Sequence, residues 1–141
     1  MLLSRTATAR LVAQLGAMAL ALAGCQREVV PVSGQVTVNG QPLVGAVITF
    51  QPRRARQAGE KPGAGSIGRT DDQGRFVLRQ VTPSRYGAVV GEHAVMIIPA
   101  ETWNGPPLPR AWQDGSRRFV VPPGGTRQAN FEITLPDRAA P

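Results

Sequence analysis

Val32-Ser33-Gly34-Gln35-Val36-Thr37-Val38-Asn39-Gly40-Gln41-Pro42 is the stretch of sequence that decides the fold. Apolar residues and one glycine occupy every second position of 32–38, as in a strand with one buried face. The Asn39-Gly40 pair then supplies the two positive φ angles of a type I′ turn. A second alternating run follows over 44–51 and places four residues on one face: Val44, Ala46, Ile48 and Phe50. The two runs predict a β-hairpin with one buried side.

A second hairpin is predicted over 66–80. Its turn is Asp71-Asp72-Gln73-Gly74, because aspartate side chains accept hydrogen bonds from nearby backbone N–H groups and glycine adopts the left-handed conformation. Phe76 and Leu78 are expected on the buried face of the strand that follows. Two adjacent aspartates do not supply the alternating oxygen ligands of a calcium loop, so the turn is the preferred interpretation.

The most apolar strand is predicted at 92–98. One face carries His93, Val95 and Ile97, and the other carries three more apolar residues: Ala94, Met96 and Ile98. Two apolar faces indicate a central strand that is covered on both sides. His93 is the only histidine of the chain, and we interpret it as a packed ring rather than a catalytic group.

Two further strands are predicted near the C-terminus. The first, 119–121, is ended by the strong turn signal Pro122-Pro123-Gly124-Gly125. The second, 129–135, alternates cleanly between apolar and polar residues before Pro136 ends it. Several short strands at this spacing, without a helical period after residue 24, predict an all-β sandwich.

The first 24 residues have the parts of a secretory signal peptide. Arg5 and Arg10 give a positively charged start, and 11–23 is an apolar run broken only by Gln14. As a helix this run would span roughly 20 Å, short of the ~30 Å hydrocarbon core of a bilayer. A membrane-spanning helix is therefore the weaker interpretation.

Leu22-Ala23-Gly24-Cys25 resembles a bacterial lipobox and contains the only cysteine of the chain. The resemblance implies that signal peptidase recognises Leu22, Ala23 and Gly24, and that Cys25 is acylated and attaches the protein to a membrane. The alternative is a signal peptide cut elsewhere, with an incidental thiol at Cys25. The expected organisation is a signal peptide (1–24), a lipid-anchored tether (25–31), a β-sandwich domain (32–136) and a tail (137–141).

These segments predict a protein of the cell envelope, anchored to a membrane and facing the periplasm or the outer membrane. The formal net charge is +7, which by itself would suit a nucleic-acid partner. We expect no nucleic acid, because an exported protein rarely meets it and the arginines are spread along the chain. Only Arg53, Arg54 and Arg56 cluster, in a polar loop over 52–64. Anionic headgroups or acidic glycans fit the location better.

Three motifs resemble the transthyretin-like, carboxypeptidase regulatory-like domains. They are the alternating run 32–50, the turn Thr70-Asp71-Asp72-Gln73-Gly74-Arg75-Phe76, and Gly91-Glu92-His93-Ala94-Val95, in which His93 replaces the usual tyrosine. The likeness extends to planctomycete-type small lipoproteins that carry such a domain. It implies a seven-stranded Greek-key β-sandwich (prealbumin-like) that serves as a structural, adhesive or carrier module. A likeness of fold alone does not establish chemistry.

A long stretch over 99–116 contains four prolines and is predicted to lack regular structure. It also contains both tryptophans, Trp103 and Trp112. In one interpretation the two indoles fold back over the outer face of the 92–98 strand. In the other they form a ligand site, since loops of this length in compact domains are often functional.

The two chemistries that the resemblance brings with it need residues that this chain lacks. Hydroxyisourate hydrolysis uses several histidines and a C-terminal Tyr-Arg-Gly-Ser, and intradiol ring cleavage uses iron held by two tyrosines and two histidines. This chain has one histidine, His93, and one tyrosine, Tyr86. It also lacks a Gly-x-Ser-x-Gly motif. We therefore expect no enzymatic activity, no metal and no cofactor.

Two functions follow from the sequence. The preferred one is a lipid-anchored, non-catalytic β-sandwich module of the cell envelope with a structural or protein-interaction role. The alternative is a module that binds an envelope glycan or peptide through Trp103 and Trp112.

Overall fold

The computed structural model describes residues 28–53 and 63–136. Three groups of predictions lie outside the described residues: the signal peptide with its lipobox and Cys25, the loop arginines Arg54 and Arg56, and the tail 137–141. Among the described residues, no helix is both long enough and apolar enough to cross a bilayer.

The larger of two main sheets is antiparallel throughout, with the strand order β11-β10-β4-β5-β7-β8. Its strands are β4 (Val47–Pro52), β5 (Ser66–Arg69), β7 (Arg79–Gln80), β8 (Arg85–Tyr86), β10 (Gly91–Ile98) and β11 (Arg117–Val121).

The smaller sheet is built around β2, which pairs with β12 in parallel and with β3 and β6 antiparallel. Its strands are β2 (Ser33–Val38), β3 (Gln41–Pro42), β6 (Arg75–Val77) and β12 (Phe131–Ile133). A separate ladder joins β1 (Val29–Val30) to β9 (Ala88–Val89) in antiparallel register.

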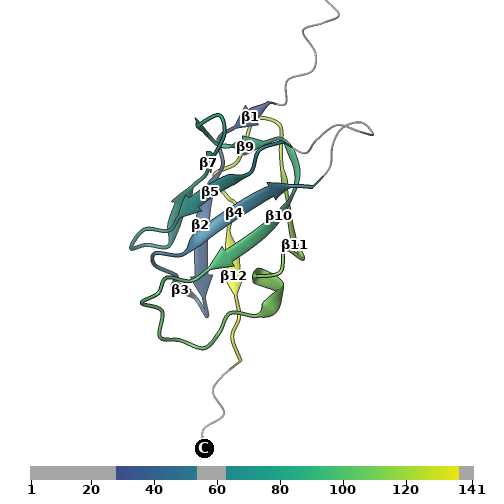
Figure 1. Cartoon of the computed structure of the whole chain (residues 1–141). Coiled ribbons are helices and arrows are strands. Elements are labelled where there is room, and N and C mark those ends of the chain that lie inside the picture. The colour runs from purple at the N-terminus through teal and green to yellow at the C-terminus, as the bar shows by residue number, and fades with distance from the viewer. Residues whose placement is uncertain (1–27, 54–62, 137–141) are drawn as a thin grey trace, which may run out of the picture.

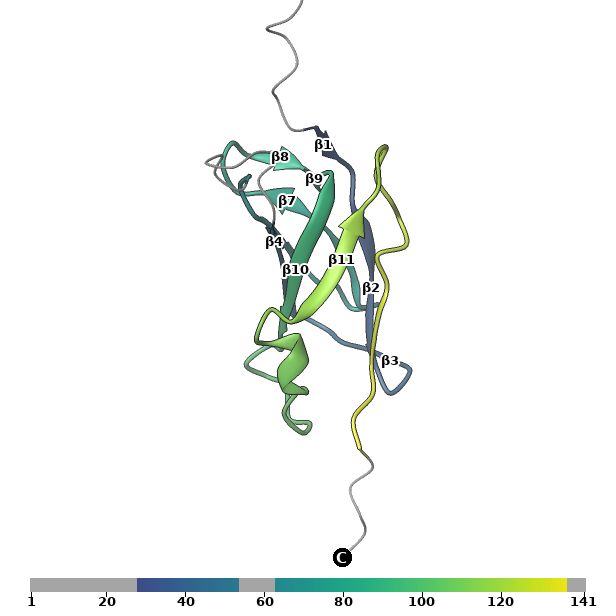
Figure 2. The ribbon, with the colours of Figure 1, turned by 90° about the vertical axis from the view of Figure 1, so that its right-hand side faces the viewer.

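The two main sheets pack face to face, which confirms the predicted all-β sandwich. Figure 2 shows the layers side by side, with β4 and β10 in one layer and β2 in the other. The rings of Phe50 on β4 and Phe131 on β12 meet across the interface at 6.0 Å between centroids. The alternation over 129–135 is confirmed, because its four apolar side chains are buried and the polar ones between them are exposed. The described residues form twelve strand segments, several of only two residues, and these do not establish the count of seven.

The first predicted hairpin is correct at its turn and wrong beyond it. Asn39 and Gly40 have φ angles of 48° and 80°, as a type I′ turn requires. Only two residue pairs follow, Thr37 with Pro42 and Val38 with Gln41. The chain then crosses to the opposite sheet, where β4 pairs with β10 and β5. Val44 lies in this crossing and is 47% exposed, so its predicted place on the buried face is wrong.

The second predicted hairpin is confirmed at its turn and at its ends, where β5 pairs with β7, but the residues between them join the smaller sheet. Gly74 has φ 72° and its N–H donates to the Asp71 carbonyl at 2.9 Å, which confirms the turn. After the turn, β6 pairs with β2 in the smaller sheet, and the chain returns to pair β7 with β5. Phe76 and Leu78 are buried, as predicted.

β10 is the central strand that the sequence predicts, since it lies between β11 and β4. Its inner face, with His93, Val95 and Ile97, is fully buried. The prediction that the outer face is also covered holds only in part, because Ala94 is buried while Ile98 is 55% exposed.

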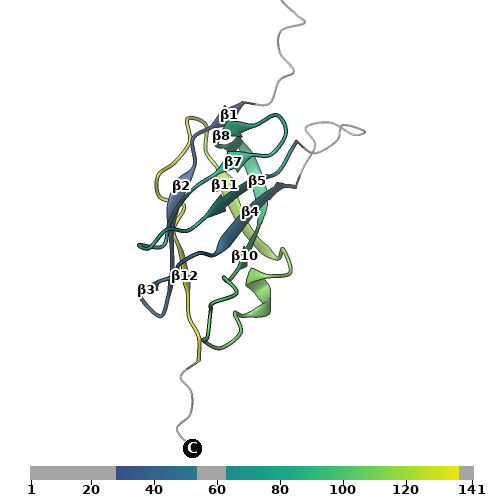
Figure 3. The ribbon, with the colours of Figure 1, turned by 60° about the vertical axis from the view of Figure 1, so that its left-hand side comes forward.

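The expected tether is too long by at least two residues. Val29 and Val30 pair with Val89 and Ala88, and Val30 is only 3% exposed. The Val90 N–H also donates to the Glu28 carbonyl at 3.0 Å. The folded domain therefore begins before Val32. Figures 1 and 3 show β1 at one end of the sandwich, while the loop before β11, with its helical turn, lies at the opposite end.

Candidate functional site

A groove of about 720 Å³ lies on the outer face of the smaller sheet. Its floor is β2 at Ser33, Gly34 and Gln35. The side chains of Ser33 and Gln35 point outward, because Val32 and Val36, which alternate with them, are buried in the core. The groove is therefore built on the polar side of β2.

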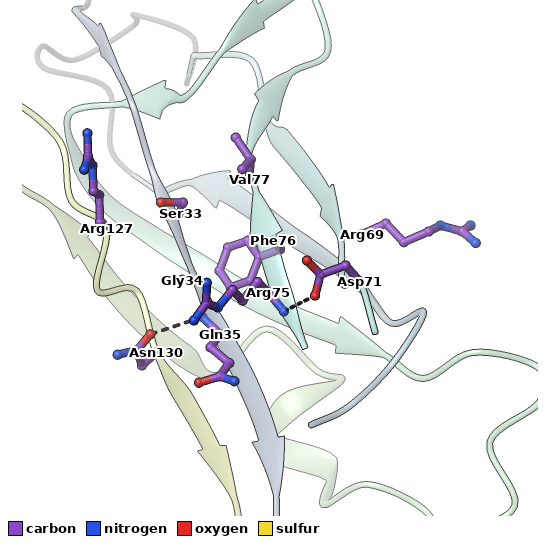
Figure 4. Close-up of a pocket in the computed structure, with 10 residues that line it drawn as sticks. All are labelled: Ser33, Gly34, Gln35, Arg69, Asp71, Arg75, Phe76, Val77, Arg127 and Asn130. Carbon is purple, nitrogen blue, oxygen red and sulfur yellow. Dashed lines mark hydrogen bonds between the residues drawn. The ribbon is translucent and has the colours of Figure 1, made fainter. Parts of the chain in front are cut away.

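The floor is low because β2 carries little side-chain bulk there. A Cβ on Gly34 would overlap the carbonyl oxygen of Ala129. Glycine at this position lets the segment before β12 lie directly beside β2, and the Ala129 N–H donates to the Ser33 carbonyl at 3.1 Å. Long polar side chains stand on both sides of the strip at Ser33 and Gly34 (Figure 4).

Arginines flank the floor from both sides. Figure 4 shows Arg127 and Asn130 on one side of β2, and Arg69 and Asp71 on the other. A third arginine, Arg75, comes from β6, whose register places it opposite Gln35. Three guanidinium groups and one carboxylate thus line the groove, which gives it a net positive charge.

Hydrogen bonds fix the polar groups of the groove in place. The Asp71 Oδ1 accepts from the N–H groups of Gln73 and Arg75, both at 2.9 Å. The Asn130 Oδ1 accepts from the Gln35 N–H at 3.1 Å, and the Gln35 Nε2 donates to the Gln73 carbonyl at 2.7 Å. One oxygen of Asp71 and the side-chain oxygen of Asn130 are therefore engaged by backbone. The donors that remain at the groove include the guanidinium groups, the Asn130 amide nitrogen and the Ser33 hydroxyl.

The arginines of the groove differ from others on the surface. Within 28–53 and 63–136, an ion pair joins the Arg118 Nε to the Glu92 Oε1 at 3.5 Å. Neither of these residues lines the groove. In that part of the chain, Arg69, Arg75 and Arg127 have no carboxylate partner. Their charge is available to a ligand.

Trp112 does not cover the outer face of β10, as one interpretation of the sequence has it. It ends a short 3₁₀ helix, η2 (Arg110–Trp112), and is only 6% exposed. Its ring packs edge-on against Phe131 at 5.8 Å, so it belongs to the core between the sheets. The Arg117 guanidinium lies 4.3 Å from the centre of the indole. Trp112 has little surface left for a ligand.

Trp103 remains half-buried at the edge of the core. Its Nε1 donates to the Pro106 carbonyl at 3.0 Å, and its ring lies so close to Gly105 that a Cβ there would overlap it. The loop thus folds on itself around this indole. Neither tryptophan lines the groove, so the structure does not unite the two sequence-predicted ligand residues with the basic site.

His93 is a packed ring, as predicted. It is 1% exposed, and its ring centre lies 5.6 Å from that of Phe50. The Nδ1 donates to the Gly91 carbonyl at 2.9 Å, which leaves the buried Nε2 without a hydrogen-bond partner. Burial lowers the pKa of His93, and the bond to Gly91 offsets part of that effect. Across the described ranges, His, Cys, Asp and Glu do not gather in threes that could hold a metal.

The arginines of the groove are not predicted from the sequence. Arg53, Arg54 and Arg56 stand out because they are close together in the chain, whereas the groove takes its arginines from positions far apart. The available signal was the outward phase of Arg75, which alternates with buried Phe76. That signal marks exposure but does not show which arginines converge.

Comparison of the chain with protein-family models, with curated proteins and with solved structures gives no match. The resemblance to transthyretin-like domains therefore stays a prediction, and the groove is interpreted from its own geometry.

Proposed function

We propose that this chain is a lipid-anchored, non-catalytic interaction module of the cell envelope, held to a membrane by acylated Cys25. In this proposal the β-sandwich is of the transthyretin-like, carboxypeptidase regulatory-like type. The observation that carries it is the place where the folded domain begins. β1 starts at Val29, only a few residues after the lipobox cysteine.

A tether this short would fix the orientation of the domain. Three residues separate Cys25 from Val29, and an extended chain of that length reaches only about 10 Å. β1 is itself held by its pairing with β9 and by the burial of Val30. The end of the sandwich with β1 and β9 would face the bilayer, and the loop containing Trp103 and Trp112 would point away from it.

Charge at the proposed membrane-facing end supports this orientation. Figure 2 shows β8 close to β1, and β8 carries exposed Arg85. Basic residues near a membrane surface are attracted to anionic headgroups by about 1 kcal/mol each. The groove lies on a side face of the sandwich, so anchoring would leave it open to a partner.

The second candidate, a glycan- or peptide-binding site made by Trp103 and Trp112, has weaker support. Trp112 is part of the core, and only the half-buried Trp103 offers any aromatic surface. The groove with its arginines is the better-formed binding surface.

The test of anchoring is Cys25→Ser, compared with Gln26→Ser as a matched control at the next position. We expect the wild type and Gln26→Ser in the membrane fraction, with a diacyl or triacyl mass on the N-terminal peptide. Cys25→Ser should move to the soluble envelope or secreted fraction, because stable anchoring requires more than one acyl chain. An unmodified Cys25 with the leader intact in the wild-type protein would overturn the proposal.

A further inference from the structure

We propose that the groove over β2 binds an acidic peptide segment of a partner protein, with Arg75 and Arg127 holding its carboxylates from two sides. This inference rests on the proposed role as an interaction module and adds the chemistry of the partner.

The arrangement of charge favours an anionic ligand that lies across β2. Arg75 stands on β6 on one side of the floor, and Arg127 precedes β12 on the other side. A guanidinium is a planar fork that binds a carboxylate through two parallel hydrogen bonds. A ligand on the floor would meet such forks at both flanks. Asp71 is the only carboxylate at the groove, and its Oδ1 is already occupied by two backbone N–H groups.

The uncharged lining of the groove suits a peptide. The Asn130 Oδ1 is held by the Gln35 N–H, so the amide nitrogen of Asn130, like the Ser33 hydroxyl, can donate to a ligand carbonyl. Val77, 57% exposed beside the floor, offers an apolar contact to a ligand side chain. The volume of about 720 Å³ lies within the range of roughly 300–1,000 Å³ for ligand pockets.

Single-stranded nucleic acids fit this surface less well, because their bases commonly stack on exposed aromatic rings. The one aromatic residue of the groove is Phe76, whose ring is buried and stacked on Phe131 at 6.3 Å between centroids. The groove therefore offers carboxylate-binding forks without a stacking platform.

The test is a fluorescence-anisotropy titration of the purified full-length chain with a labelled oligo-glutamate peptide. A labelled oligo-glutamine peptide of equal length serves as the uncharged control. We expect the acidic peptide to bind, the neutral one not to bind, and the affinity to fall as salt rises. Arg75→Gln and Arg127→Gln should each weaken binding about tenfold, as expected for the loss of a charge-assisted hydrogen bond.

Arg85→Gln is the matched control, because Arg85 is exposed on β8 and does not line the groove. Its affinity should stay within about twofold of the wild type, and thermal melts should show that all three variants fold. An equal loss in Arg85→Gln would mean that net charge alone binds the peptide, and the proposal would then be wrong. Absence of binding by the wild type would also overturn it.

Polygalacturonate in the same titration separates peptide from glycan. Tighter binding of the polysaccharide, with the same dependence on Arg75 and Arg127, would overturn the assignment to a peptide. Because the titration uses purified protein, its result does not depend on acylation of Cys25. A failure here leaves the anchor intact, and a failure of the fractionation test leaves the groove intact.

Discussion

Several arginines of the six-stranded sheet make contacts that the groove arginines Arg75 and Arg127 do not make. On the six-stranded sheet, the strand registers align Met96, Thr49, Ile67, Arg79 and Tyr86 in one row across five strands. Arg79 in this row is occupied, because its guanidinium lies 5.2 Å from the centre of the Tyr86 ring and its Nε donates to the Ser84 Oγ at 2.6 Å.

Two other arginines of the six-stranded sheet are occupied too, whereas Arg69 at the end of β5 lines the groove and Arg85 on β8 is exposed. Arg118 pairs with Glu92, and Arg117 lies over the Trp112 ring. On the four-stranded sheet, Arg75 and Arg127 stand beside a low strip of short side chains and have no such partner among the described residues. The difference indicates that Arg79, Arg117 and Arg118 contribute to stability, while Arg75 and Arg127 are available for binding.

Among the substitutions predicted here, Gly34→Val should have the largest effect on the free energy of unfolding. Its side chain would collide with the Ala129 carbonyl and push the segment before β12 away from β2. We expect a loss of about 3 kcal/mol in the free energy of unfolding, at the upper end of the usual cost of overpacking. Urea denaturation measures it, with Ser33→Val as the matched control on the outward face. The control should change stability by less than about 0.5 kcal/mol, and equal losses in both variants would contradict the role given to Gly34.

Buried His93, in the core between the two sheets, should make the stability of the fold depend on pH. Burial lowers the pKa of His93 in the folded state. Below about pH 6.5 the imidazole is therefore protonated in the unfolded chain while it is still neutral in the folded chain. Stability should therefore be constant above that pH and fall as pH decreases, by up to about 1.4 kcal/mol per pH unit. Urea denaturation between pH 5 and 8 measures this slope.

His93→Leu is the control for the pH dependence, because it removes the only histidine of the chain. Its free energy of unfolding should not show the decline between pH 6.5 and 5. A wild-type profile that is flat over this range, or that rises toward acid, would contradict the burial of a neutral ring.

Arg79→Gln and Arg127→Gln directly compare an arginine that makes contacts with one that lines the groove. Their effects on the free energy of unfolding should be the smallest of those predicted. Arg79→Gln should lose about 0.5–1 kcal/mol of stability, the usual worth of an exposed cation–π contact. Arg127→Gln should leave stability within about 0.5 kcal/mol of the wild type, as for a surface substitution that removes no contact. Thermal or urea unfolding measures both, and a larger loss in Arg127→Gln than in Arg79→Gln would reverse the distinction between the two arginines.

Local patterns predicted more of the fold than of the site. Period-two alternation placed Ile48, Phe50 and Ile133 correctly in the core, since it depends only on the pleat of a strand. The same alternation did not show which sheet each strand joins, so the first predicted hairpin was wrong after its turn and the second missed the pairing of β6 with β2, although β5 and β7 do pair. Val44 was misplaced because it lies in the crossing between sheets, where the pleat is interrupted. Trp112 was misplaced because a proline-rich loop has no period from which to read burial.

The sequence by itself determined which residues turn and which face inward, because the φ preferences at Asn39-Gly40 and Gly74 and the alternation of side chains are properties of neighbouring residues. Only the tertiary structure decided that β6 lies beside β2, that β12 runs parallel to β2, and that Arg75 and Arg127 flank one floor. Strand pairing joins residues far apart in the chain, and an alternating strand buries its apolar face equally well against many partners. The groove depends on that choice of partners, and so it has no local signature.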